Sequence, residues 1–185
     1  MKTLWALIFM SLAGAVALGQ GSDFFSPEEV QKLRDFQEID KRAENFLKIA
    51  AARLDELDRR LELSKGAAPD PNPLEFFRLS ELMMSYNAAF DSLMNNLDDR
   101  FKVKEEPKRL KKAFKLTLDK AREFAPRVEK IRELSIEKQD KALYDQSLLA
   151  LENSGAALKG SENFLAVFDS GEEKPKGKLK EKKKP

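Results

Sequence analysis

Residues 26–66 read SPEEVQKLRDFQEIDKRAENFLKIAAARLDELDRRLELSKG, and their pattern predicts a long amphipathic helix. Ser26, Pro27 and Glu29 form a helix start, because they supply a capping hydroxyl, a first-turn proline and a capping-box glutamate. We therefore expect one unbroken helix from Pro27 to Lys65, about 57 Å long. The apolar residues recur at spacings of three and four, which gives the narrow apolar seam typical of bundle helices. The residues of this seam are Leu33, Phe36, Ala43, Leu47, Ala50, Leu54, Leu57 and Leu61.

The segment Asn72-Pro73-Leu74-Glu75 repeats the same start signal. We expect a second helix to begin there and to fray before Lys102. The methionines of Leu82–Tyr86 could form an adaptable binding surface, but at helical spacing we assign them to the core. The seam of this helix is Phe76, Leu79, Met83, Tyr86, Phe90, Leu93 and Leu97.

Two more helices are expected in the second half of the chain. The third begins near Pro107 and carries Pro126, which should kink it by removing a backbone hydrogen bond. A polar turn over Ser135–Asp140 leads into a fourth helix over residues 141–168. We place Leu110, Phe114, Thr117, Ala121, Phe124, Val128 and Ile131 inward on the third helix. On the fourth helix we place Tyr144, Leu148, Leu151, Gly155, Leu158 and Leu165 inward.

Short links between helices of similar length favour an antiparallel up-down four-helix bundle over residues 20–169. The alternative is three long helices, with the chain helical over residues 73–125 and 127–168. Neither strand patterns nor internal repeats are evident, so we expect an all-α fold.

Residues 1–19 resemble a secretory signal peptide. Lys2 is followed by the apolar run Leu4–Leu18, and Ala17 and Gly19 suit a cut before Gln20. The run is short for a membrane span. We therefore expect a periplasmic or secreted protein, or a membrane-tethered one if the segment is retained.

The sequence contains no Cys and no His. The absence of Cys excludes disulfides and a lipid-attachment cysteine, and the absence of His removes the commonest general base and transition-metal ligand. We predict no catalytic, cofactor-binding or metal site, and hence a non-enzymatic protein. A carboxylate-based enzyme is the less favoured alternative.

Basic residues are concentrated in two places. Residues 100–115 hold eight basic residues against two acidic ones, and residues 170–185 hold seven Lys against three Glu. Cations in the first turns of a helix oppose its dipole, so an external anion would stabilise them. The alternative is internal neutralisation by Asp98, Asp99, Glu105, Glu106 or acidic faces of other helices. The candidate anion-binding residues are Lys108, Arg109, Lys111, Lys112 and Lys115.

Residues 170–185 are low in complexity and nearly devoid of apolar residues, so we expect a disordered tail. It could tether the protein to an anionic envelope polymer or membrane surface, or only increase solubility. Nucleic acid is not expected as a partner, because export separates the two and no aromatic residues interleave with the lysines.

Asp40 falls on the apolar seam of the first helix, where a carboxylate is costly to bury. It could pair with a basic residue and fix helix register, contribute to a cation site, or reach water near the end of the bundle.

Residues 106–113, EPKRLKKA, followed by residues 127–134, RVEKIREL, and a polar turn resemble an uncharacterised group of exported bacterial all-helical proteins. The resemblance implies an envelope setting but no activity, ligand or residue role. We therefore expect an exported helical-bundle binding or scaffolding protein with an unknown protein partner. The alternative is a periplasmic chaperone that holds clients on an amphipathic groove.

Overall fold

The computed structural model describes residues 24–65, 71–102 and 106–170, and within these ranges the only regular elements are helices. The prediction of an all-α protein is confirmed. The predicted signal segment over residues 1–19 lies outside the described residues, and so does the predicted tail over residues 170–185 except for Ser170, which ends α5. The five helices are α1 (Pro27–Asp35), α2 (Ile39–Arg60), α3 (Leu79–Lys102), α4 (Pro107–Glu137) and α5 (Lys141–Ser170).

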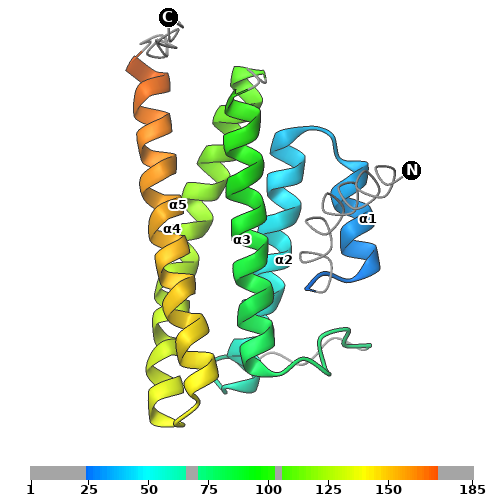
Figure 1. Cartoon of the computed structure of the whole chain (residues 1–185), viewed down its shortest axis with the longest axis vertical. Coiled ribbons are helices and arrows are strands. Elements are labelled where there is room, and N and C mark those ends of the chain that lie inside the picture. Colours follow the sequence, from blue (N-terminus) through cyan, green and yellow to red (C-terminus); the bar gives the residue numbers. More distant parts are fainter. Residues whose placement is uncertain (1–23, 66–70, 103–105, 171–185) are drawn as a thin grey trace, which may run out of the picture.

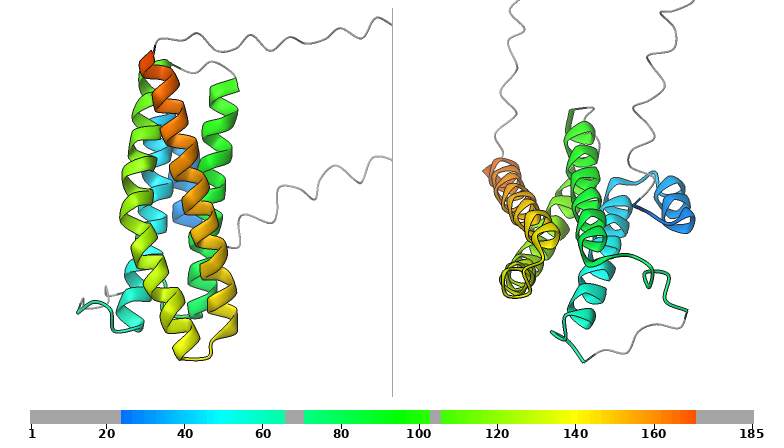
Figure 2. Two further views of the ribbon diagram at one scale, coloured as in Figure 1. Left: turned by 90° about the vertical axis from the view of Figure 1, so that its left-hand side faces the viewer. Right: turned by 60° about the horizontal axis from the view of Figure 1, so that its bottom comes forward.

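Helices α2 to α5 lie side by side around one hydrophobic core, while the short α1 packs on the outside of α2 (Figure 1). Around the core the order is α2, α3, α5, α4, so that α3 and α4 lie across the core from each other despite being consecutive in the chain (Figure 2). No described helix is both long enough and apolar enough to cross a lipid bilayer.

Side-chain contacts define the helix directions. Asp40 near the start of α2 meets Lys112 near the start of α4, so these two helices run parallel. Asn87 of α3 donates to Gln146 of α5, while the rings of Phe101 and Phe164, further along the same helices, lie 5.4 Å apart. Helices α3 and α5 are therefore also parallel.

The prediction of one unbroken helix over Pro27–Lys65 is wrong, because α1 ends at Asp35 and α2 begins at Ile39. The capping box at Ser26 and Glu29 is present as predicted. However, the carboxylate of Glu29 lies 2.6 Å from the guanidinium of Arg53. In a continuous helix these residues would be about 36 Å apart. The break at residues 36–38 lets α1 fold back and bury Leu33.

The predicted helix start at Asn72 is also wrong. Asn72 accepts a hydrogen bond from the Leu74 amide, but only a turn follows, and α3 begins at Leu79. Arg60 donates to the carbonyl oxygens of Leu74, Glu75 and Phe77, which a continuing helix would need for its own hydrogen bonds. Phe76, expected in the seam, is 91% exposed.

The seam predicted for the third helix is confirmed, since all seven of its residues are buried in α4. The alternative of three long helices is wrong for two reasons. Helix α3 ends at Lys102 and a separate helix, α4, begins at Pro107. Helix α4 then continues through Pro126 instead of ending there. The turn after α4 is shorter than expected. It occupies residues 138–140, with Gln139 at φ 58°.

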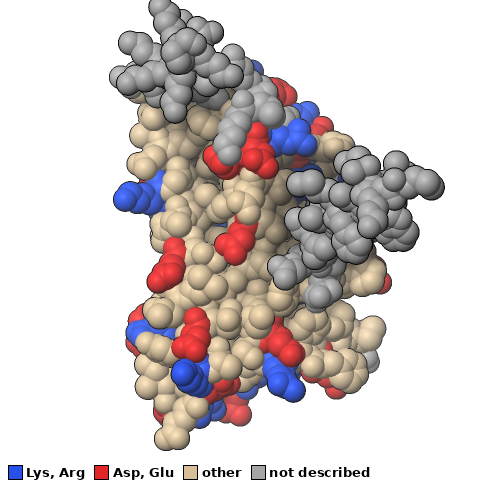
Figure 3. Space-filling view, in the orientation of Figure 1, with Lys and Arg blue, Asp and Glu red and all other residues tan. Residues whose placement is uncertain are grey.

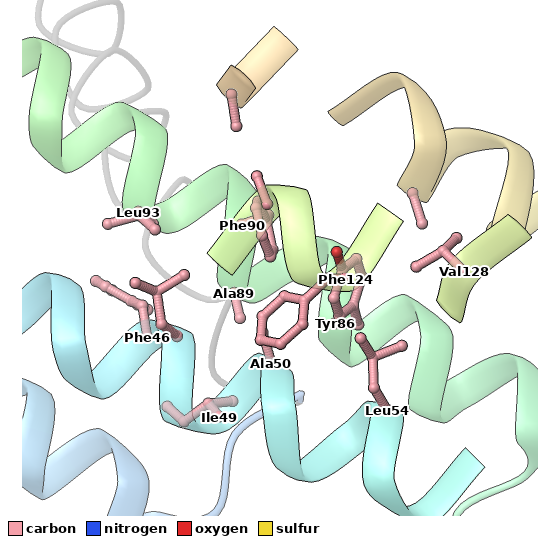
Figure 4. Packing of buried hydrophobic residues seen from close by; sticks show 14 of the residues in the cluster. Phe46, Ile49, Ala50, Leu54, Tyr86, Ala89, Phe90, Leu93, Phe124 and Val128 are labelled. Carbon is pink, nitrogen blue, oxygen red and sulfur yellow. The ribbon is translucent and has the colours of Figure 1, made fainter. Parts of the chain in front are cut away.

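The inward face predicted for the fourth helix is only partly right. Leu151, Leu158 and Leu165 are half-buried and pack against the core, whereas Leu148 and Gly155 are exposed. None of the six predicted residues is fully buried in α5. The rings of Tyr86, Phe90 and Phe124 fill the centre of the core, with centroids 4.9 to 6.1 Å apart (Figure 4). Since α3 and α4 supply this bulk, α5 packs closely with small side chains. Its buried residues are Leu143, Ser147, Ala150, Ser154, Ala157 and Ser161.

Candidate anion-binding site

The predicted anion-binding residues occupy the first two and a half turns of α4. Pro107 takes the first helical position, and Glu106 is the N-cap residue but makes no capping hydrogen bond with its side chain. The first turn contains no acidic residue. The backbone N–H groups and the basic side chains therefore both present positive charge at this helix end.

Arg109 is neutralised within the protein. Its guanidinium lies 2.6 Å from Glu38, which precedes α2, and 2.8 Å from Glu106. Hydrogen bonds to these two carboxylates raise the pKa of Arg109. Arg109 therefore links the start of α4 to the start of α2.

Lys112 is also paired inside the protein. Its Nζ donates to Oδ2 of the buried Asp40 at 2.7 Å, and Arg109 lies 3.5 Å from the other carboxylate oxygen. Burial raises the pKa of Asp40, but the hydrogen bond from Lys112 and the charges of Lys112 and Arg109 outweigh it, so the pKa is lowered. Asp40 also sits in the first turn of α2, where the helix dipole favours a carboxylate. Of the three roles considered for Asp40, pairing with a basic residue is confirmed.

Lys111 joins the start of α4 to the end of α5. Its Nζ forms an ion pair with Asp169 and lies 4.9 Å from the centre of the Phe168 ring. This contact places residue 170, the last described residue before the Lys-rich segment, at the basic end of α4.

Lys108 and Lys115 are exposed, and neither forms an ion pair with a residue in the described ranges. The structure thus divides the five predicted residues. Arg109, Lys111 and Lys112 are neutralised by acidic residues from three places in the chain, which is the alternative of internal neutralisation. Lys108 and Lys115 keep their charges available to solvent.

The sequence pattern did not predict two charged clusters. One holds α1 and the segment before it against α2, and the other holds part of the connection between α2 and α3. Arg53, 2% exposed, donates to both carboxylate oxygens of Glu29, to Ser85 and to the carbonyl of Phe24. Arg53 lies three residues after Ala50 and four before Leu57, beside the apolar seam. This position could have predicted a buried arginine with hydrogen-bond partners, because a buried charge without partners is costly.

The second cluster surrounds Glu56, which is 4% exposed and accepts hydrogen bonds from Arg59, Arg60 and Asn72. Hydrogen bonding from Arg59 is the main cause that lowers the pKa of Glu56 to about 2, despite the opposing effect of burial. The cluster fixes the connection between α2 and α3.

Among the described residues no cluster of three or more acidic side chains is arranged to hold a metal ion. A small pocket of about 150 Å³ between α1 and α2 is partly open to solvent and is lined by Glu29, Lys32, Asn45, Lys48 and Ile49. The geometry that bears most directly on binding is therefore the basic end of the bundle.

Comparison with known proteins returns no match to any family model, curated protein or solved structure.

Proposed function

We propose that the chain is an exported, non-enzymatic four-helix bundle that binds or scaffolds a component of the bacterial envelope through one end. In this proposal residues 1–19 are a cleaved signal peptide and residues 170–185 are a disordered basic tail. The partner is an anionic surface, either an envelope polymer or a membrane.

The supporting observation is the contact between Lys111 and Asp169. It places the start of the Lys-rich segment beside the first turns of α4, where Lys108 and Lys115 are exposed. In this proposal the exposed charges of Lys108 and Lys115 act together with those of the Lys-rich segment, which lies more than 50 residues further along the chain. Attraction of several lysines to an anionic surface is additive, at about 1 kcal/mol each near the surface.

The test measures binding of the protein to vesicles that contain anionic lipid and, separately, to vesicles of neutral lipid. We expect binding only to the anionic vesicles, with steep weakening as salt rises. Deletion of residues 171–185 should weaken binding most, and the double substitution Lys108→Ala and Lys115→Ala should weaken it further.

The matched control is the pair Lys32→Ala and Lys48→Ala, which removes the same charge from the side of the bundle near α1. This control should bind as the unsubstituted protein does. Equal binding to neutral vesicles, or equal loss with both pairs of substitutions, would contradict attachment through the basic end.

A further inference from the structure

The face of α5 that points away from the core is largely apolar. Leu148, Leu149 and Val167 are between 41% and 44% exposed. Between them lie small exposed residues, and a Cβ added at Gly155 would meet nothing within 4 Å. The surface view from the side of α3 and α5 shows broad uncharged areas between isolated charged side chains (Figure 3). A helix that is apolar on its outer face as well commonly has a partner there.

Two opposite charges on this outer face lack partners. Glu152 and Lys159 are exposed, and neither forms an ion pair or hydrogen bond with any residue that the structure describes. By contrast, Glu162 is engaged by Arg122 of α4 at 2.7 Å, and Asp169 is engaged by Lys111.

We propose that this outer face is a self-association surface, on which α5 packs antiparallel against α5 of a second copy. The face has similar residues in both directions from a midpoint between residues 157 and 158. Leu148-Leu149 ends it on one side and Ala166-Val167 on the other, and the small exposed residues Gly155 and Ala156 lie near the middle.

A two-fold axis at that midpoint would cover the exposed apolar residues and would also give the unpaired charges partners of opposite sign. It sets Leu148 opposite Val167 of the second copy, while the small exposed residues Gly155 and Ala156 allow the helices to approach closely. Lys159 then lies about one helical turn from Glu152 of the second copy, and the same pair forms twice because the contact is isologous. This self-complementarity is the reason to assign a second copy as the occupant, and it does not depend on the proposed function.

Sedimentation equilibrium of the purified protein should show a reversible monomer–dimer equilibrium. Glu152→Lys should weaken the dimer about tenfold, since two attractive pairs become repulsive at once. Combining Glu152→Lys with Lys159→Glu should restore association. Glu133→Lys, an equal charge change at an exposed position of α4, is the matched control and should leave association unchanged.

The absence of cysteine allows the register to be tested directly. An equal mixture of Leu148→Cys and Val167→Cys chains should form disulfide-linked dimers under mild oxidation. Each variant alone should remain mostly uncrosslinked, because its thiols lie at opposite ends of the antiparallel pair.

Three outcomes would overturn the proposal. The protein could stay monomeric at all concentrations, or Leu148→Cys could crosslink to itself, which indicates a parallel pair. In the third outcome a monomeric protein suppresses aggregation of a denatured test protein and loses that activity with Leu149→Glu, which assigns the face to unfolded clients.

Discussion

At the scale of single residues, Arg53 and Glu56 are buried charges that each bind a segment outside the main helices. Arg53 holds α1 and the segment before it, and Glu56 holds the connection to α3 together with Arg60. Breaking such a pair leaves its partner poorly solvated, so one-sided substitutions are more damaging than the net strength of the pair suggests.

Replacing Arg53 with Met should lower the free energy of unfolding by about 2–4 kcal/mol, because the carboxylate of Glu29 loses its ionic partner and two of its hydrogen bonds. Urea denaturation followed by circular dichroism measures the change. Arg34→Met, an exposed position on α1, should change stability by less than about 0.5 kcal/mol. Equal effects of the two substitutions would show that the Arg53 contacts carry no net stability.

The lowered pKa of Glu56, about 2 against an ordinary 4.5, predicts acid sensitivity. A carboxylate whose pKa falls on folding stabilises the protein above its unfolded pKa, and this stability is lost as pH falls from about 4.5 to 2. The effect amounts to about 3 kcal/mol. The stability difference between the unsubstituted protein and Glu56→Gln should therefore shrink by about this amount between pH 7 and pH 2, and a constant difference would refute the assignment.

At the scale of elements, periodicity predicted α4 correctly because its apolar residues are large and its opposite face is charged. The same reasoning was only partly right for α5, where Leu148 and Leu149 face outward and most of the fully buried residues are Ser and Ala. Which face is buried was decided by the volume of Tyr86, Phe90 and Phe124 on other helices, and a single-helix pattern does not contain that information.

The break between α1 and α2 was missed for a related reason. The seam continues through residues 36–38, and no Gly or Pro marks the interruption. The bend depends on the tertiary contact of Glu29 with Arg53. At the candidate site, likewise, the basic cluster was visible in the sequence, but the acidic partners Asp40 and Asp169 come from other helices and required the fold.

The packing of α5 predicts opposite effects for two neighbouring positions. Ala157→Leu should destabilise the protein by about 2–3 kcal/mol, because a large side chain must enter a filled core. Gly155→Ala should stabilise it by about 0.5–1 kcal/mol, because the added methyl meets no atom and the helix gains propensity. Thermal unfolding of the two variants at concentrations where the protein is monomeric tests this, and destabilisation of the monomer by Gly155→Ala would mean that the glycine face points inward.

At the scale of the whole molecule, the four longer helices share one core, whereas α1 touches only α2 among the helices. Each of α2 to α5 packs against at least two neighbours, so these helices should unfold together. Leu33 is the one buried residue of α1, and the Phe25–Phe46 ring pair at 6.3 Å involves the segment before it, so α1 should have a lower local stability.

Native-state hydrogen exchange should therefore show two levels of protection. Amides of α1 should exchange through local opening, while buried amides in the middle of α2 and α4 should exchange only through global unfolding. Because Arg53 is the main polar link to α1, Arg53→Lys should speed exchange in α1 far more than in α4, since lysine cannot reproduce the two-pronged contact with Glu29. Exchange in α1 at the global rate would instead show that α1 unfolds as part of the same cooperative unit, and the Arg53 cluster would then be part of the core.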